Sequence, residues 1–538
     1  MGVQENAIIF SRNTVTTPAC ATVCHHPLPS LQVFLKRPTS GGQKAKVVKG
    51  TFRKWNNGKI IVATTFRTKS VEPRNVTVEM EVCQDEFQAL FDAPRPSNNF
   101  TPLLNATHMG YFDTVLFLLN AKANVNHRTG YPEHSAVFVA AMQGNSRILG
   151  ELIRANAELD DRNSYHMRAL DIAAQHGHTN TVKMLLEAKA HVNAESVKVK
   201  SSIHYAARAG QIQCMQLMCA AKANVDSRDD SRGDACTPLH MMAADQACTL
   251  NVVQFLLGMK ANPNATNSSS LCPITIATIN GAAIEVVDAI LGAKANVNMR
   301  DIWKKWSPLH FAVEYSRPDV IQRLIKAGAK IDAKTDNLET ALHMACKQDC
   351  WESVDILVKA GASLNARAKL NSTPLHHAAQ ANHKLVLEKL LAAKAEVDAR
   401  RDFHWTPLHC AVYQGHSGTV FALLTNKASP AARDEDHETP LHLAARIGHT
   451  TLVHTLLQAK ADPSSQTRTD LETPLHAAVE GRCLDSVQLL VNAKANLLSQ
   501  DIFGHRPIDR ANIKDFMIVN AVSVATNPLS AEQLFDLL

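Results

Sequence analysis

The sequence predicts a mostly α-helical solenoid of about thirteen helix–turn–helix repeats, preceded by a small β-rich module. Two observations lead to this prediction. A short motif, TPLH or a near relative, recurs along the chain, and successive copies are 33 to 36 residues apart. Each copy also contains two short apolar stripes at helical spacing, and the two helices that carry them are too small to bury both stripes without neighbours. Such a unit is stable only when it stacks on copies of itself, as in a solenoid.

The clearest copy runs from Thr439 to Asp462. Thr439 is a favourable N-cap, and Pro440 occupies the first helical position, where its missing N–H costs nothing. Gly448 interrupts this helix, and a second amphipathic stretch follows it. The first stripe comprises Leu441, Ala444 and Ala445, and the second comprises Leu452, Val453, Leu456 and Leu457.

The copies of the motif cover about three quarters of the chain. They begin at Thr101, Ser135, Arg168, Ser201, Thr237, Cys272, Ser307, Thr340, Thr373, Thr406, Thr439, Thr473 and Arg506. A helix–turn–helix that opens on TPLH with a 33-residue period resembles the ankyrin repeat family, and the resemblance extends from about Phe100 to Ala511. It implies a concave groove, lined by the inter-repeat turns and the first helices, that holds a protein partner.

The resemblance also implies a structural role for the histidine of TPLH, which in this family bonds the backbone across neighbouring repeats. The histidines at this position are His204, His240, His310, His343, His376, His409, His442 and His476. With one histidine in each repeat, neighbours are roughly 10 Å apart, too far to share a metal ion.

We divide the chain into four parts: a disordered tail (1–30), a small basic β-rich module with a capping helix (31–92), the repeats (97–511) and C-terminal capping helices (512–538). Residues 31–35, 59–66 and 76–82 have strand-like composition, and Asn56-Asn57-Gly58 is a hairpin signal. Residues 84–91 and 513–524 are expected to form amphipathic helices that cover the ends of the stack. The final LFDLL looks like a docking motif, but we interpret it as part of the cap or a frayed tail.

The net charge of +6 comes from the N-terminal part of the chain, because residues 1–95 alone carry a net +6 and the rest is neutral. The repeats therefore do not attract polyanions through bulk charge. Basic residues lie among aromatic ones in the module, and they could hold RNA or an anionic membrane. We favour a solvated face and keep this tether as the alternative function. The basic patch comprises Lys44, Lys46, Lys49, Arg53, Lys54 and Lys59.

Motifs of nucleotide binding, nucleophilic catalysis and kinases are absent from the sequence. The cluster from Cys20 to His26 has metal-ligand residue types but lacks a recognised spacing. We therefore expect no enzymatic activity, metal, cofactor or small-molecule substrate. The scattered cysteines and the lack of a signal peptide or long apolar run favour the cytoplasm or nucleus. We also expect a monomer.

In this family the second helix usually ends in a glycine with left-handed backbone, and only Gly328 and Gly361 keep that residue. Asn156 takes the place in the second repeat. If the backbone is left-handed, each lysine there costs roughly 1 kcal/mol relative to glycine, and the helix dipole recovers about 0.3–1 kcal/mol. The lysines would form a row along one edge of the solenoid. They are Lys122, Lys189, Lys222, Lys260, Lys294, Lys394, Lys427, Lys460 and Lys494.

We expect the partner to bind repeats seven to ten. Designed members of the family vary the turn before TPLH, the residue next to it and two positions at the end of the first helix. Aromatic residues occupy several of these positions, and large aromatic residues are enriched at binding hot spots. The expected partner-binding residues are Trp303, Trp306, Glu314, Tyr315, Lys347, Gln348, Asp402, Phe403, Trp405, Tyr413 and Gln414.

Overall fold

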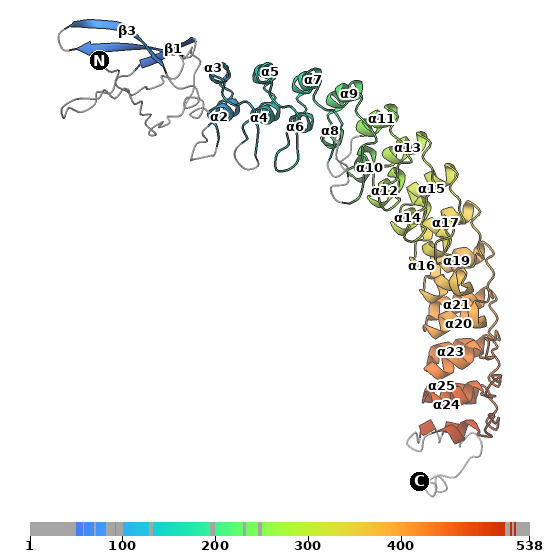
Figure 1. Cartoon of the computed structure of the whole chain (residues 1–538). Coiled ribbons are helices and arrows are strands. Elements are labelled where there is room, and N and C mark those ends of the chain that lie inside the picture. Colours follow the sequence, from blue (N-terminus) through green and yellow to red (C-terminus); the bar gives the residue numbers. More distant parts are fainter. Residues whose placement is uncertain are drawn as a thin grey trace, which may run out of the picture. The chain divides into compact units, whose positions relative to one another are not determined.

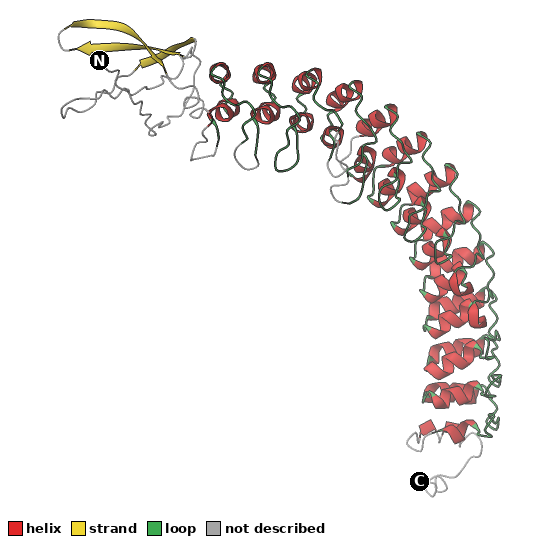
Figure 2. Ribbon diagram, viewed as in Figure 1, coloured by secondary structure: helices red, strands yellow, loops and turns green. Residues whose placement is uncertain are grey.

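A computed structural model describes residues 50–56, 59–68, 71–81, 92, 100–128, 133–193, 200–229, 233–245, 250–511, 517–518 and 521–522. The chain forms two compact units, residues 1–231 and 232–538. Figure 1 labels their helices and strands, and Figure 2 shows that paired helices joined by loops make up the repeats in both units. The predicted helical repeat architecture is therefore confirmed.

The first unit begins with a three-stranded antiparallel sheet of order β1-β2-β3. Its strands are β1 (Gly50–Asn56), β2 (Lys59–Thr68) and β3 (Val71–Glu81). Asn56 pairs with Lys59, so two residues separate the strands at the predicted hairpin. Two of the three strand-like runs fall on β2 and β3, whereas residues 31–35 lie outside the described part. The strand β1 was not predicted from the sequence.

The four repeats of the first unit contain two helices each. These helices are α2 (Pro102–His108), α3 (Phe112–Asn120), α4 (Ala136–Gln143), α5 (Ser146–Arg154), α6 (Ala169–His176), α7 (Thr179–Glu187), α8 (Ser202–Arg208) and α9 (Ile212–Ala220). Even-numbered helices are the first of each pair and pack on one another, as do odd-numbered helices. Each repeat thus buries its apolar stripes against its own partner helix and its neighbours, as a solenoid requires.

The second unit repeats the same pattern. Its helices are α10 (Pro238–Ala244), α11 (Leu250–Gly258), α12 (Pro273–Ile279), α13 (Ile284–Gly292), α14 (Pro308–Glu314), α15 (Pro318–Lys326), α16 (Ala341–Lys347), α17 (Trp351–Lys359), α18 (Pro374–Gln380), α19 (Lys384–Ala392), α20 (Pro407–Tyr413), α21 (Ser417–Thr425), α22 (Pro440–Ile447), α23 (Thr450–Gln458), α24 (Pro474–Glu480) and α25 (Leu484–Asn492). Three 3-10 helices lie in its turns: η1 (Lys369–Asn371), η2 (Asp402–His404) and η3 (Pro507–Arg510). In the thirteenth repeat, η3 replaces the first helix.

The apolar stripes of the clearest repeat form its core. Leu441, Ala444 and Leu456 are fully buried, whereas Leu457, at the edge of the second stripe, is half-buried. Such burial contributes about 25 cal/mol per Å² of apolar surface removed from water. The stacked stripes are therefore the main source of stability in each unit.

Glycine lies where two repeats approach closely. The first helix α4 ends at Gly144, whose φ is 68°, and a Cβ there would lie 2.6 Å from Nδ1 of His178 in the next repeat. Gly415 faces His449 in the same way, at 2.8 Å from Cε1. Glycine therefore fits these two turns without strain, whereas Asp349 and Asn382 occupy the same position with positive φ in front of His383 and His416.

The C-terminal cap is described only in part. Residues 517–518 and 521–522 are helical and lie within the helix expected at 513–524, and Ile518 and Val522 are buried. The N-terminal tail, residues 84–91 and the LFDLL sequence lie outside the described residues. The expected capping helices at 84–91 and beyond 522, and the division into four parts, therefore remain predictions.

Candidate partner-binding site

The histidines of TPLH hold neighbouring repeats together from inside. In repeat eight, the backbone N–H of Thr340 donates to Nδ1 of His343 at 3.1 Å, and Nε2 of His343 donates to the carbonyl oxygen of Ser372 in the next repeat, at 3.1 Å. A carbonyl only accepts, so Nε2 carries the proton and Nδ1 accepts. The same pair of bonds recurs at His310, His376, His409, His442 and His476.

These histidines are neutral at pH 7. Desolvation by burial is the main cause, because it disfavours the charged imidazolium. Burial lowers the pKa from 6.5 to about 4 in five of them: His310, His343, His376, His409 and His442. Among the described residues, no group of three or more His, Cys, Asp and Glu side chains is arranged to hold a metal ion.

Repeat three builds the same cap from different residues. Its motif is RALD, and Asp171 accepts a hydrogen bond from the backbone N–H of Arg168 at 2.8 Å, as the histidine does elsewhere. The Arg168 guanidinium in turn contacts the Asp171 carboxylate at 3.1 Å, and both side chains are buried. Ser202 of the next repeat donates to Asp171 at 2.6 Å. A buried ion pair therefore replaces the threonine–histidine pair in this repeat.

A ladder of Asn and Asp side chains also joins the repeats and was missed by the sequence analysis. Each accepts a hydrogen bond from a backbone N–H in the next repeat, at 2.6 to 3.0 Å. The signal in the sequence is an Asn or Asp four residues after the lysine position, as in Lys394 and Asp398. The ladder comprises Asn126, Asp160, Asn193, Asn264, Asn298, Asp332, Asn365 and Asp398.

The two tryptophans that precede TPLH are half-buried and pack within their own repeats. Trp306 meets the ring of Phe311 edge-on, with centroids 5.2 Å apart, and Lys304 lies over its face. Trp405 lies 5.4 Å from Tyr413, between centroids. The contact between Trp405 and Tyr413 places a turn residue and the end of the first helix α20 on one surface.

Other aromatic residues of the expected set project into solvent. Trp303 is 72% exposed and Phe403 67% exposed, and Tyr315 and Tyr413 are about half exposed. The backbone φ of Phe403 is +60°, which is rare for a bulky residue. Two neighbouring turns place leucine in similar positions: Leu338 and Leu370 are exposed, with φ of 59° and 58°.

The polar residues of the expected set link the same repeats sideways. Gln348 donates to the Glu314 carboxylate across the boundary between repeats seven and eight. Asp402 accepts from the amide of Asn371 at 2.7 Å, which joins the turns of repeats nine and ten. Lys347 and Gln414 lie exposed at the ends of α16 and α20. We call the turns and first-helix ends of repeats seven to ten the turn face.

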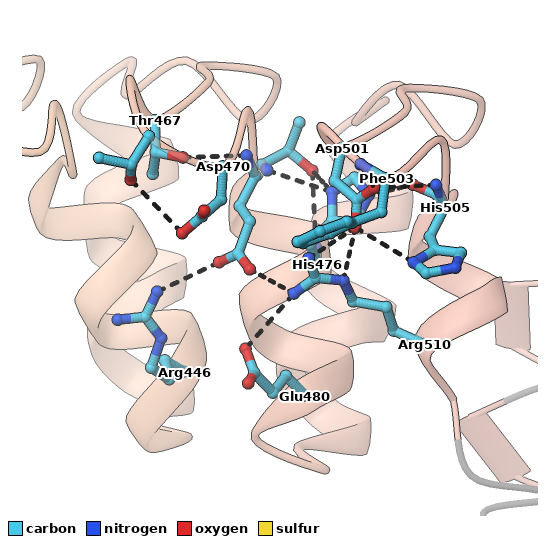
Figure 3. A network of polar contacts seen from close by, with 12 residues as sticks. Arg446, Thr467, Asp470, His476, Glu480, Asp501, Phe503, His505 and Arg510 are labelled. Atoms are coloured by element: carbon cyan, nitrogen blue, oxygen red, sulfur yellow. Dashed lines mark hydrogen bonds and ion pairs between the residues drawn. The ribbon is translucent and has the colours of Figure 1, made fainter.

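In repeats eleven to thirteen, charged residues beside the turns bind one another, although Leu471 and Phe503 are exposed there at the positions of Leu338 and Phe403. Figure 3 shows Arg446 and Arg510 reaching toward the carboxylates around them. Arg446 pairs with Glu438 and lies 3.4 Å from Glu472, and Arg510 pairs with Glu472 and Asp501. Burial raises the pKa of Glu438 despite this pairing. These charged side chains therefore satisfy one another.

All nine lysines at the ends of the second helices have left-handed backbone. Their φ values lie between 59° and 71°, similar to Gly328 and Gly361 at 88° and 87°, and Asn156 is left-handed as well. The nine side chains are exposed. Because the backbone is left-handed, each lysine carries a backbone cost of roughly 1 kcal/mol relative to glycine.

Replacing one of these lysines by glycine should therefore stabilise the protein. We expect Lys189→Gly and Lys394→Gly each to raise the free energy of unfolding by up to about 1 kcal/mol at high salt, where the dipole contribution is screened. Thermal unfolding of the single variants would measure the effect. Equal or lower melting temperatures for both would mean that the lysines make stabilising contacts that outweigh the strain.

The basic N-terminal patch is described only by its backbone. Arg53 and Lys54 lie on β1 and Lys59 begins β2, whereas Lys44, Lys46 and Lys49 lie outside the described residues. The tether to RNA or an anionic membrane remains a prediction. No helix among the described residues combines the length and the apolar character needed to cross a membrane.

Comparison with known proteins supports the interpretation of the repeats. A family model described as "Ankyrin repeats (3 copies)" matches residues 125–196, 274–368, 363–434 and 416–501. A second, described as "Ankyrin repeat", matches residues 98–130, 200–230 and 234–268. Ankyrin repeats are generally protein–protein interaction modules.

Individual relatives match only parts of the chain. A stretch of 71 residues is 31% identical to the phosphate system positive regulatory protein PHO81 of Saccharomyces cerevisiae, and it covers 13% of this chain and 6% of that protein. The crystal structure of the human ASB11 ankyrin repeat domain is similar at 28% identity with a TM-score of 0.37, and the match covers 42% of this chain and all of that domain. The family models together span more than half of the chain, which therefore belongs to the ankyrin repeat family.

Proposed function

We propose that this protein is a non-catalytic scaffold that binds a partner protein through the turn face of repeats seven to ten. The observation that carries the proposal is the exposure of large apolar side chains at the tips of successive turns. Trp303, Leu338, Leu370 and Phe403 occupy the turns of four consecutive repeats. Exposed apolar groups that lie together mark interaction surfaces.

Backbone strain strengthens this proposal. Leu370 and Phe403 have positive φ three residues before the cap of the first helix, whereas Leu338 lies one residue later, where most repeats are left-handed. Glycine or asparagine at positions 370 and 403 would suit the backbone better and would expose less apolar surface. Strain that persists without a benefit to folding is typical of functional positions. A partner that covers these side chains supplies the benefit, because burial of an aromatic anchor can contribute 2 kcal/mol or more to binding.

Lateral hydrogen bonds hold the turns in place for such a partner. The backbone N–H of Asp336 donates to the carbonyl of Lys304 at 3.1 Å, and that of Glu435 donates to the carbonyl of Phe403 at 3.0 Å. Lys369 reaches the Asn337 side chain at 2.8 Å. A preorganised surface loses little entropy on binding, which favours affinity.

Substitution of the exposed turn residues tests the proposal. The full-length chain is used to capture partners from cell extract, and captured proteins are identified and compared between the parent and the variant Trp303→Ala, Tyr315→Ala, Phe403→Ala. We expect the affinity for a purified captured partner to fall at least about tenfold. The half-buried Trp306 and Trp405 are unsuitable for this test, since their truncation would also remove packing inside the repeats.

A matched variant controls for the loss of exposed apolar groups. Phe421 and Leu385 are 62% and 60% exposed on the second helices α21 and α19, away from the turns. The variant Leu385→Ala, Phe421→Ala should keep the parent affinity. Full affinity in a folded turn-face variant, or an equal loss in the control, would place the binding surface elsewhere.

A further inference from the structure

A second surface lies at the ends of the second helices, apart from the turn face. Four consecutive repeats, nine to twelve, place an exposed lysine there: Lys394, Lys427, Lys460 and Lys494. We call this row the lysine edge. Within the described residues, the ion-paired lysines of this unit are others, namely Lys359, Lys384 and Lys389. The four ammonium groups therefore face solvent without a carboxylate partner.

Helix stability does not explain why these lysines stand at strained positions. A cation near a helix C-terminus interacts favourably with the helix dipole, but it can do so from the last helical turn. Repeats seven and eight use that arrangement, with Lys326 and Lys359 ending their helices and unstrained Gly328 and Gly361 two residues later. In repeats nine to twelve the cation occupies the left-handed position itself. Its placement at the edge, rather than its charge alone, needs an explanation.

The carboxylates nearest in sequence to these lysines bond to other groups and form no ion pair with the lysine edge among the described residues. Asp398 accepts the backbone N–H of Ser429 at 3.0 Å, as part of the ladder between repeats. Glu396 lies 3.9 Å from Arg367 of the preceding repeat. Asp462 accepts from the N–H of Ser464 in its own loop, at 2.9 Å. The four ammonium groups of the lysine edge therefore stay available to the carboxylates of a partner.

The chemistry of the row indicates the class of partner. Alanine or asparagine flanks each lysine, so the edge offers no aromatic ring on which a nucleic-acid base could stack. Without net charge, the repeats also provide no long-range field to attract a long polyanion. A short acidic segment needs no such field, because it senses charges within a Debye length of about 8 Å.

We propose that the lysine edge of repeats nine to twelve binds an extended, Asp- and Glu-rich segment of a partner protein. Stacked helices are about 8–10 Å apart, and an extended chain in the polyproline II conformation advances about 3.1 Å per residue with three residues per turn, so every third side chain lies on the same side. Roughly one carboxylate in every three residues would therefore meet one lysine per repeat. The small side chains beside each lysine, such as Ala393 and Ala395, allow the segment to lie close to the edge.

A synthetic peptide tests the proposal directly. The probe is a fluorescent peptide of about twelve residues with glutamate at every third position and Gly or Ser between, which matches four repeats. Its anisotropy is measured with the full-length chain and with the variant Lys394→Gly, Lys427→Gly, Lys460→Gly, Lys494→Gly. We expect at least about tenfold weaker binding by the variant. Because glycine relieves strain at each site, the melting temperature of the glycine variant should not fall. A loss of binding could then not be attributed to unfolding.

Two further variants and a second probe complete the test. Lysine to arginine at the same four positions should keep the binding, because the charge stays. Glutamine at four lysines of the turns (Lys304, Lys305, Lys334 and Lys369) removes the same total charge and should also keep it. Unchanged peptide binding by the glycine variant would overturn the proposal. So would tighter binding of a duplex oligonucleotide that the same variant loses, since the edge would then serve a nucleic acid.

Discussion

Replacing Arg168 by alanine should destabilise repeat three by about 3–5 kcal/mol, because the fully buried Asp171 carboxylate would lose the cation that compensates it. The Arg168 guanidinium contacts Asp171 and also reaches Ser202 Oγ at 3.2 Å, so its removal weakens the boundary with repeat four as well. Hydrogen exchange of α6 and α8 would report the local free energy of opening. We expect the double variant Arg168→Thr, Asp171→His, which restores the usual capping pair, to recover part of the loss.

The chain contains its own control for this experiment. Arg506 and Asp509 form the same ion pair at the same position of repeat thirteen, 3.0 Å apart, but both side chains are solvent-accessible. Arg506→Ala should therefore cost only about 0.2–1 kcal/mol. Similar losses in the two variants would show that burial does not set the strength of the Arg168 pair.

Acidification should unfold repeats seven to eleven before the carboxylates of the protein titrate fully. Five TPLH histidines there have folded pKa values of about 4, against 6.5 in the unfolded chain. The unfolded state therefore binds more protons below pH 6.5. The contribution of these histidines to stability is fully present above that pH and is lost as the pH falls toward 4. Within that window, each histidine lowers the free energy of unfolding by about 1.4 kcal/mol for every pH unit of acidification.

Tryptophan fluorescence can follow this transition, since four of the five tryptophans lie in repeats seven to ten. As the pH is lowered from 7.5 to 5, we expect the urea concentration at the midpoint of unfolding to decrease in proportion to the number of buried histidines. The substitution His409→Gln should reduce the slope of the free energy of unfolding against pH by about 1.4 kcal/mol per pH unit, even if the variant is less stable at every pH. A midpoint that does not change over this range would mean that the histidines are already protonated or become exposed without unfolding.

The period of the motif was enough to predict the repeats because stacking leaves one repeat little freedom. Every copy of TPLH must place its first helix on the helix before it, so the spacing alone defines the architecture. The lysine positions could be predicted for the same reason: Gly328 and Gly361 identify the left-handed residue, and its neighbours must share its backbone.

Features that depend on pairs of residues were harder to predict. RALD looks like a lost motif until Arg168 and Asp171 are seen to replace threonine and histidine together. The burial of Trp306 and Trp405 likewise depends on Phe311 and Tyr413, which a position-by-position comparison does not consider. The exposure of Leu338 and Leu370 could not be inferred either, because an isolated leucine in a turn usually packs inward.

The bond from each TPLH histidine to the following turn gives the stack a direction. During synthesis, a repeat such as that of His442 emerges before the carbonyl of Glu472 that its Nε2 requires. Closure of each repeat thus lags one repeat behind elongation, and any repeat at the growing end has an unsatisfied donor. Repeat thirteen escapes this requirement, because Asp509 takes the place of the histidine and bonds the backbone and side chain of its own Arg506. It therefore supplies the acceptor for the repeat before it without needing a backbone carbonyl from a following turn.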